Sequence, residues 1–151
     1  MVNVKSKGMS GEREVIMMLQ AEIDKVVKES GCERVVLRRN LEQVRSGGAD
    51  VEGLEWIEVE VKRREGEDVK KWWAQVSEAA RKSGERRGGA VEPVLLWREN
   101  RGKWKVRMRV GVERDGKWWK VPGMVELEVF LWWFRGMVEE RVKAGRGIEK
   151  V

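Results

Sequence analysis

The stretch from Ile57 to Lys62 constrains the fold most, because apolar and charged residues alternate in it without interruption. A period of two places successive side chains on opposite faces of a β-strand. The two faces would be apolar and charged, with Ile57, Val59 and Val61 on one and Glu58, Glu60 and Lys62 on the other. The pattern therefore predicts a strand whose polar face carries two acids and a lysine in a row.

A further acid precedes this strand across a glycine turn. Asp50 lies ten positions before Glu60, and Gly53 supplies a turn signal between them, so we expect an antiparallel hairpin. A three-residue loop, 53–55, places Asp50 opposite Glu58 and diagonal to Glu60, with Cβ atoms roughly 7 Å apart. A two-residue loop places Asp50 opposite Ile57 instead and separates the acids.

These residue types predict a metal-dependent phosphodiesterase site. Hard carboxylate oxygens suit Mg²⁺, with Mn²⁺ as a substitute, and such an ion keeps waters and a phosphate oxygen in its shell. Lys62, next along the same face, is suited to orient or deprotonate the attacking water and to neutralise charge on the phosphate. The alternative is a solvated strand face, since Glu-x-Lys alone is a common sequence.

Missing residue types narrow the chemistry further. The chain contains no histidine, no tyrosine and one cysteine, Cys32. Internal disulfides, cysteine-rich zinc sites, Ser-His-Asp catalysis and tyrosine nucleophiles are therefore excluded. Carboxylate, lysine and metal remain for hydrolysis.

Charge and hydropathy indicate the partner and the compartment. Thirty-two Lys and Arg against 26 Asp and Glu give a net charge of +6, which favours a polyanion, most simply nucleic acid, and would also suit an acidic lipid surface or an acidic protein. No long apolar run and no signal-like N-terminus occur. We expect an intracellular, cytoplasmic protein without a membrane partner, acting in the host cytoplasm if a virus encodes it.

The 151 residues suit one domain, 1–151. We expect a flexible basic entry at 1–9, with Lys5 and Lys7, then a nuclease core at 10–100. The core begins with a helix over about 11–30, in which apolar residues recur every three or four positions. Glu12 falls on that stripe and should face the sheet, either as a first-turn acid favouring the helix dipole or as a further metal ligand.

The remainder of the chain predicts two more helices and a hairpin. A helix over 67–83, with Gln75 on its apolar stripe, and a strand over 91–97 complete a β-α-β unit with parallel strands. Alternating runs at 103–112 and 117–121 flank Asp115-Gly116, and a last helix spans about 125–144. Residues 101–145 are a candidate dimer element. Trp72 and Trp73 are expected in the core, whereas the pairs 118–119 and 132–133 suit the core, a dimer contact or, less well, base stacking.

Arginines gather around the predicted site. The arginines that precede the Gly47-Gly48 turn either form an ordinary solvent-exposed charged segment or bind DNA phosphates beside the site. We favour phosphate binding. The candidates for DNA contact are Lys5, Lys7, Arg13, Arg38, Arg39, Arg45, Arg63 and Arg64.

Four segments together resemble a known family. They are Lys5-Ser6-Lys7-Gly8, Gly11-Glu12-Arg13-Glu14, Arg45-Ser46-Gly47-Gly48-Ala49-Asp50 and Ile57-Glu58-Val59-Glu60-Val61-Lys62. Their order and spacing resemble the archaeal-type Holliday junction resolvases of the PD-(D/E)xK nuclease superfamily, over about residues 5–97. The resemblance implies an α/β, restriction-endonuclease-like fold with a central mixed β-sheet flanked by helices. It also implies a Mg²⁺-dependent homodimer that cuts four-way DNA junctions by paired symmetric nicks.

By this resemblance Glu12, Asp50 and Glu60 bind the metal and Lys62 serves the attacking water. Ser46 would touch the scissile region, and Gln75 matches a glutamine found in parts of the superfamily. Ala49 stands where a proline would complete the Pro-Asp pair, and the choice of Glu60 over Glu58 rests on the position of Lys62. Two other readings stay open: a general repair or restriction-type nuclease, and a noncatalytic protein that binds branched DNA.

Overall fold

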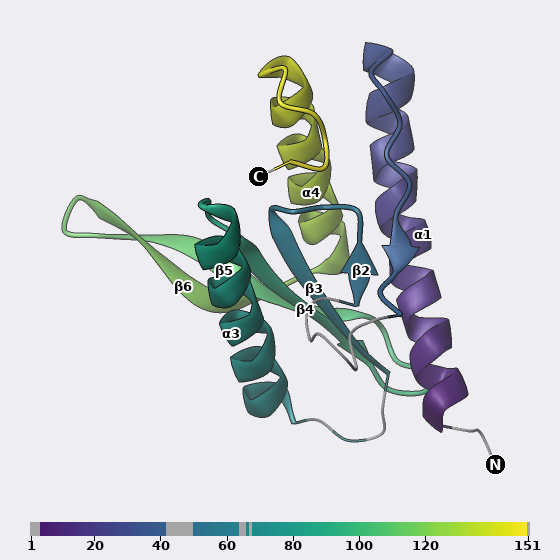
Figure 1. Ribbon diagram of the computed structural model, residues 1–151. Helices are drawn as coiled ribbons and strands as arrows, with labels where there is room; N and C mark the ends of the chain where they lie inside the picture. The colour runs from purple at the N-terminus through teal and green to yellow at the C-terminus, as the bar shows by residue number, and fades with distance from the viewer. Residues whose placement is uncertain (1–3, 42–49, 64–65, 67, 151) are drawn as a thin grey trace.

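The computed structural model describes residues 4–41, 50–63, 66 and 68–150. In chain order the described elements are α1 (Val4–Ser30), β1 (Arg38–Arg39), β2 (Val51–Glu52), β3 (Ile57–Arg63), α3 (Val69–Arg87), β4 (Glu92–Arg98), β5 (Lys105–Arg114), β6 (Lys117–Val125) and α4 (Leu127–Lys143). The protein is thus of the α/β class, with helices on a mixed sheet and a small β1–β2 pair beside it (Figure 1).

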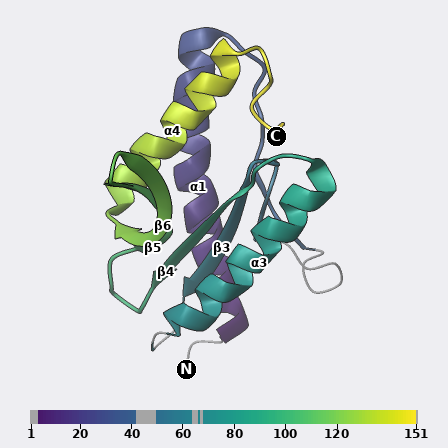
Figure 2. The same ribbon diagram turned by 90° about the vertical axis from the view of Figure 1, so that its left-hand side faces the viewer.

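The main sheet has the strand order β3-β4-β5-β6. Strands β3 and β4 are parallel and joined through α3, which confirms the predicted β-α-β unit, and the other two pairings are antiparallel. Helix α3 covers one face, while α1 and α4 lie against the other (Figure 2). Under α3, Trp72 and Val76 pack on Leu95 and Trp97, so the expected core role of Trp72 is confirmed, with Trp73 half-buried beside it.

The larger core lies between the sheet and the helices α1 and α4. Trp56, the residue before β3, is almost fully buried there and stacks on Phe134 with ring centroids 5.6 Å apart. Its Nε1–H donates to the carbonyl of Ile148 at 2.8 Å, and the N–H of Glu55 donates to Glu149 at 2.7 Å. The start of β3 therefore contacts α4 and is hydrogen-bonded to the segment that follows α4.

Helix α1 begins earlier than expected. It starts at Val4 and runs for 27 residues, so the flexible entry predicted at 1–9 is wrong for residues 4–9, while 1–3 lie outside the described residues. Lysine and methionine favour helix, and Gly8 alone opposes it strongly. The other end is as predicted, because Gly31 adopts φ 69° and its N–H donates to Val27 at 2.8 Å.

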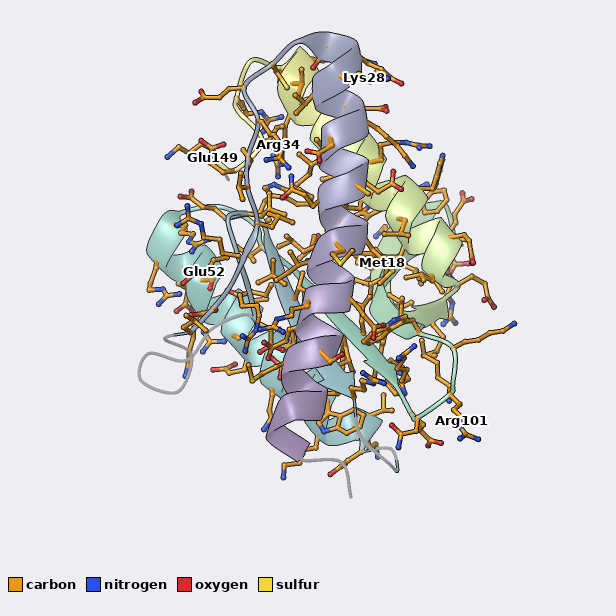
Figure 3. The ribbon with its side chains drawn as sticks, turned by 90° about the vertical axis from the view of Figure 1, so that its right-hand side faces the viewer. Met18, Lys28, Arg34, Glu52, Arg101 and Glu149 are labelled. Atoms are coloured by element: carbon orange, nitrogen blue, oxygen red, sulfur yellow. The ribbon has the colours of Figure 1, made fainter. Side chains whose placement is uncertain are left out.

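After α1 the chain runs back along the helix as an extended segment, residues 31–37. Gln20 holds it from both sides of its amide: Nε2 donates to the carbonyl of Val35 and Oε1 accepts from the N–H of Leu37, each at 2.9 Å. Arg34 makes two bonds to Asp24, at 2.8 and 3.1 Å, beside the same helix (Figure 3). These contacts deliver the chain to β1, which pairs with β2.

Gln20→Ala should lower the free energy of unfolding by about 1–3 kcal/mol, because two half-buried backbone groups lose their partner. Chemical denaturation followed by circular dichroism measures the change. Glu29→Ala, an exposed position on the same helix, is the matched control and should change stability by less than about 0.5 kcal/mol. Equal effects of the two substitutions would contradict the clamping role of Gln20.

Two element ends differ from the predictions. Helix α3 continues through Gly84 and ends at Gly88, whose φ of 70° makes it the left-handed cap. Strand β6 continues past the predicted run 117–121, through Pro122 and Gly123. Proline is tolerated there because β6 is the edge strand and pairs with β5 alone. The Asp115-Gly116 hairpin is confirmed, with φ of 51° and 74° as a two-residue turn of this type requires.

Beyond the sheet, β5 and β6 continue as a projecting two-stranded ribbon (Figure 1). Trp118 and Trp119 near its tip are 73% and 57% exposed, and Trp132 on α4 is 68% exposed, whereas Trp133 packs against the core. A core position is therefore confirmed for Trp133 and is wrong for Trp118, Trp119 and Trp132. None of the described helices combines the length and apolar character that a membrane crossing needs.

Candidate functional site

Asp50 lies against the middle of β3. Its N–H donates to the carbonyl of Val59 at 2.9 Å, and its Oδ2 accepts from the N–H of Val61 at 2.7 Å. Both the backbone and the side chain are thus fixed to the strand at the level of Glu60. The carboxyl group is held in the interior, with Asp50 only 3% exposed.

The expected tight hairpin is not formed. Strand β2 pairs with β1, and the connection from β2 to β3 spans 53–56 and not three residues. Leu54 and Trp56 are both buried, so this connection is drawn into the core and cannot close as a short surface loop. The predicted place of Asp50 opposite Glu58 is therefore wrong, and Asp50 lies beside Glu60 instead.

Electrostatics link four of the predicted site residues. Burial raises the pKa of Asp50 to about 7, the charge of Glu60 adds to this rise, and that of Glu12 adds less. The Val61 N–H bond and, more weakly, Lys62 act in the opposite direction. Three carboxyl groups from α1, the 50–52 segment and β3 thus act on one another around Asp50, together with the lysine of β3.

Two of these carboxylates are held by cationic side chains. Glu12 accepts from Nε of Arg39 at 2.7 Å, with 13% and 22% of the two side chains exposed. Glu60 pairs with Nζ of Lys62 at 2.8 Å, and both side chains are largely shielded. Asp50 forms no ion pair with the described part of the chain, and its carboxylate accepts from the Val61 N–H.

The donor set fits a hard divalent cation in its chemistry. It offers carboxylate oxygens, a buried acid with excess negative charge around it, and two cationic groups that balance its neighbours. Within the described part of the chain, however, no three His, Cys, Asp or Glu side chains are gathered around one metal position. A metal held by Glu12, Asp50 and Glu60 requires Glu12 to turn away from Arg39 and Glu60 to turn away from Lys62.

Glu58 has a different environment, although it shares a strand face with Glu60. It is buried, and one of its oxygens accepts from the hydroxyl of Ser83 on α3, which also accepts from Arg86 at 3.0 Å. Its buried Oε2 has no hydrogen-bond partner among the residues that the structure describes. Contact with α3 thus separates Glu58 from the Asp50 group and supports Glu60 as the site acid.

A second charged group, absent from the sequence predictions, borders the site. Glu14 accepts from Arg98 and from the indole N–H of Trp104, each at 3.1 Å, and lies 3.5 Å from Arg63. Arg63 also donates to the hydroxyl of Ser10 at 3.0 Å. The signal was available in part, because parallel pairing of β3 and β4 sets Arg63 beside Arg98. Together these bonds fix α1 to the strand ends next to Lys62.

Other predicted residues lie away from this group or outside the described chain. Gln75 is exposed on α3 and not on the buried stripe of that helix. Arg13 and Arg38 are exposed, and Lys5 and Lys7 fall within α1. Ser46, Arg45 and Arg64 lie outside the described residues.

Comparisons of the chain with family models, with curated proteins and with solved structures found no match. The function must therefore be argued from the arrangement of the site itself.

Proposed function

We propose that the protein is a metal-dependent endonuclease that resolves four-way DNA junctions by paired symmetric nicks. One observation carries the proposal: a buried aspartate that is surrounded by Glu12, Glu60 and Lys62, with its pKa raised to about 7. These are the residues that the family resemblance assigns to the metal and the attacking water. The mixed sheet with helices on both faces is compatible with a restriction-endonuclease-like fold.

In this proposal each side chain has a distinct task. Glu12, Asp50 and Glu60 hold Mg²⁺, with Mn²⁺ as a substitute; such an ion supplies an activated water and offsets charge on the phosphate. Lys62 donates to the attacking water or to a phosphate oxygen, from a position already within the site. Arginines around it, including Arg39 and Arg63, contact the DNA backbone.

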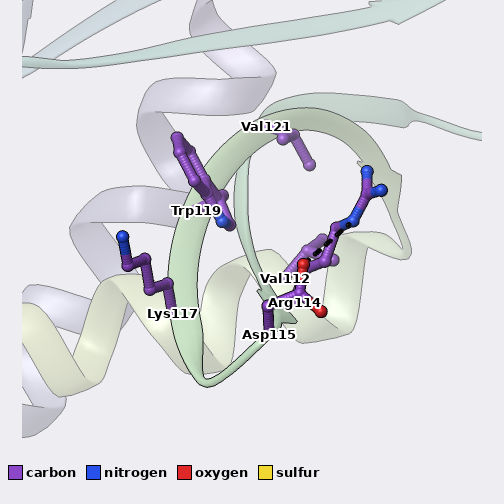
Figure 4. Close-up of a pocket in the computed structure, with 6 residues that line it drawn as sticks. All are labelled: Val112, Arg114, Asp115, Lys117, Trp119 and Val121. Atoms are coloured by element: carbon purple, nitrogen blue, oxygen red, sulfur yellow. Dashed lines mark ion pairs between the residues drawn. The ribbon is translucent and has the colours of Figure 1, made fainter.

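Symmetric cleavage needs two sites, and we propose a homodimer that uses the β5–β6 ribbon. One ribbon face continues the core side of the sheet and stays apolar where no helix covers it. A hollow of about 620 Å³ lies on this face, around Val112, Trp119 and Val121 with Arg114 and Lys117 at its end (Figure 4). On α4, the exposed Trp132 borders a smaller hollow that also includes Arg135, Glu139 and Glu140. Both surfaces are apolar at an exposed tryptophan, and two cations beside Asp115 on the ribbon would face two carboxylates beside Arg135 on α4.

Trp119→Ala should shift the protein toward monomer and raise the dimer dissociation constant at least tenfold, as expected when an aromatic anchor is truncated. Trp118→Ala is the matched control, because Trp118 is a neighbouring exposed tryptophan that leans over Gly111 on the opposite ribbon face. Sedimentation equilibrium measures both. A monomeric wild type, or equal weakening by the two substitutions, would contradict this contact.

The proposed activity is tested on a labelled immobile junction and the matching linear duplex, with Mg²⁺ or EDTA. Paired nicks in opposing junction strands, dependent on Mg²⁺ and lost in Asp50→Ala, are expected. Comparable cutting of linear duplex would favour a general repair or restriction-type nuclease, whose chemistry the same residues would perform. Junction binding without cutting would favour the noncatalytic alternative.

A further inference from the structure

We propose that the Arg39 side chain is ion-paired with Glu12 in the DNA-free protein and exchanges this carboxylate for a DNA phosphate when DNA binds. DNA and the metal would then bind cooperatively. The inference rests on the proposed function and extends it, because it assigns the assembly of the metal site to the substrate. It begins from the ion pair between α1 and β1, in which Arg39 Nε lies 2.7 Å from Glu12 Oε2.

The backbone keeps Arg39 within the site. Arg39 pairs with Val51, the residue after Asp50, in the β1–β2 ladder. The next residue, Asn40, donates its N–H to the carbonyl of Asp50 at 2.9 Å. Arg39 is therefore connected to the same short segment that positions Asp50, while its side chain crosses to α1. A small rotation of that side chain changes its partner without moving the backbone.

Charge sets the ion pair against a bound metal. A divalent cation on the Glu12 carboxylate would lie within a few ångströms of the guanidinium that is bonded to Oε2, and the site is largely shielded from water. In the proposed exchange the metal therefore displaces Arg39. The displaced guanidinium then needs a new acceptor, and a phosphate can accept two parallel bonds from it.

Lys62 differs from Arg39 in this respect. It follows Glu60 by two residues on one strand face, so it stays within the site whichever group it contacts. Arg39 comes from a separate two-residue strand, β1, and its partner Glu12 lies on α1, so it is not held on the strand that carries the site acid Glu60. The proposed exchange with DNA therefore concerns the Arg39–Glu12 pair, while Lys62 turns from Glu60 to another group inside the site.

Thermodynamic linkage gives this exchange a measurable form. If DNA removes Arg39 from Glu12, DNA raises the affinity for the metal, and the metal raises the affinity for DNA by the same factor. Removal of the guanidinium should abolish both effects. It should also free Glu12 permanently, so that the DNA-free protein binds the metal more tightly.

The test is isothermal titration with Ca²⁺, which takes the same kind of oxygen ligands as Mg²⁺, with and without an immobile four-way junction. The proteins are wild type, Arg39→Gln, Arg39→Lys and the control Arg101→Gln, which removes an exposed charge in the turn between β4 and β5. For wild type and Arg101→Gln we expect the junction to tighten Ca²⁺ binding about tenfold, within the usual range of such coupling.

Arg39→Gln should bind Ca²⁺ about tenfold more tightly without DNA and show less than a twofold further gain with it. Arg39→Lys, which keeps the charge, should retain much of the coupling. Unchanged Ca²⁺ affinity in DNA-free Arg39→Gln, or full coupling in that variant, would overturn the inference. If either of these results is found and wild type still cuts junctions with Mg²⁺, the inference about Arg39 is wrong but the proposed function stands. Absence of both cutting and metal binding in wild type would overturn both.

Discussion

Lys62→Met is expected to slow junction cleavage by about 10³-fold while leaving junction affinity in EDTA within a few-fold of wild type. Lys62 lies inside the site, 2.8 Å from Glu60, and in the proposed reaction it acts on a charge that develops only during cleavage. In the same proposal, affinity comes mainly from contacts between the many other cationic side chains and DNA phosphates. Single-turnover cleavage and electrophoretic mobility shift measure the two quantities.

The matched control is Lys71→Met, which removes an exposed lysine of α3 and keeps the same change of charge. It should cleave within a few-fold of wild type. If Lys62→Met loses binding as strongly as cleavage, the lysine is a structural or DNA-contact residue and the assigned role is wrong. A normal cleavage rate in this variant would exclude Lys62 from the reaction altogether.

Asp50→Asn is expected to stabilise the metal-free protein by a few kcal/mol at pH 8 and to have little effect near pH 4. Burial and the neighbouring Glu60 raise the pKa of Asp50 from 3.8 to about 7. The folded form therefore binds this proton more tightly than the unfolded chain. Stability from the protonated carboxyl is present below pH 4 and is lost as the pH rises to about 7, at about 1.4 kcal/mol per pKa unit.

Asparagine keeps an oxygen for the Val61 N–H and carries no charge, so it removes both the cost of burying a charge and the repulsion by Glu60. Urea unfolding between pH 4 and pH 8, in EDTA, measures the difference between the two proteins. Added Mg²⁺ should then stabilise wild type at pH 8 and Asp50→Asn much less, because ligand binding to the folded state adds to its stability. A variant that is no more stable than wild type at pH 8 would mean that the carboxylate is fully compensated.

Local patterns predicted the parts of the fold that depend on neighbours in sequence. Alternation identified β3, and the Asp115-Gly116 turn identified the β5–β6 hairpin because positive φ at both positions is a local requirement. The parallel β3–β4 pair followed from the helix between the two strands. The candidate group of Glu12, Asp50, Glu60 and Lys62 was likewise foreseen, and the structure brings these residues to act on one another.

Long-range contacts explain what could not be predicted. The register of Asp50 depends on Leu54 and Trp56, whose burial lengthens the connection to β3, and no short motif reports that burial. The return of residues 31–37 along α1 depends on one glutamine, Gln20, which bonds to residues 15 and 17 positions away. Without this path, the sequence offers no reason to pair Arg39 with Glu12.

The clamp at Gln20 also makes chain length, and not only residue identity, a requirement of the site. Gln20 and Glu12 are eight residues apart on α1. Gln20 therefore holds the returning segment at a point about 12 Å along the helix from Glu12. A single residue inserted between them would shift Glu12 by about 1.5 Å and rotate it by about 100° around the helix axis. Arg39, held by its own segment, would then face a different side of α1. The interval between these two positions should therefore tolerate substitutions on its exposed side but neither insertions nor deletions.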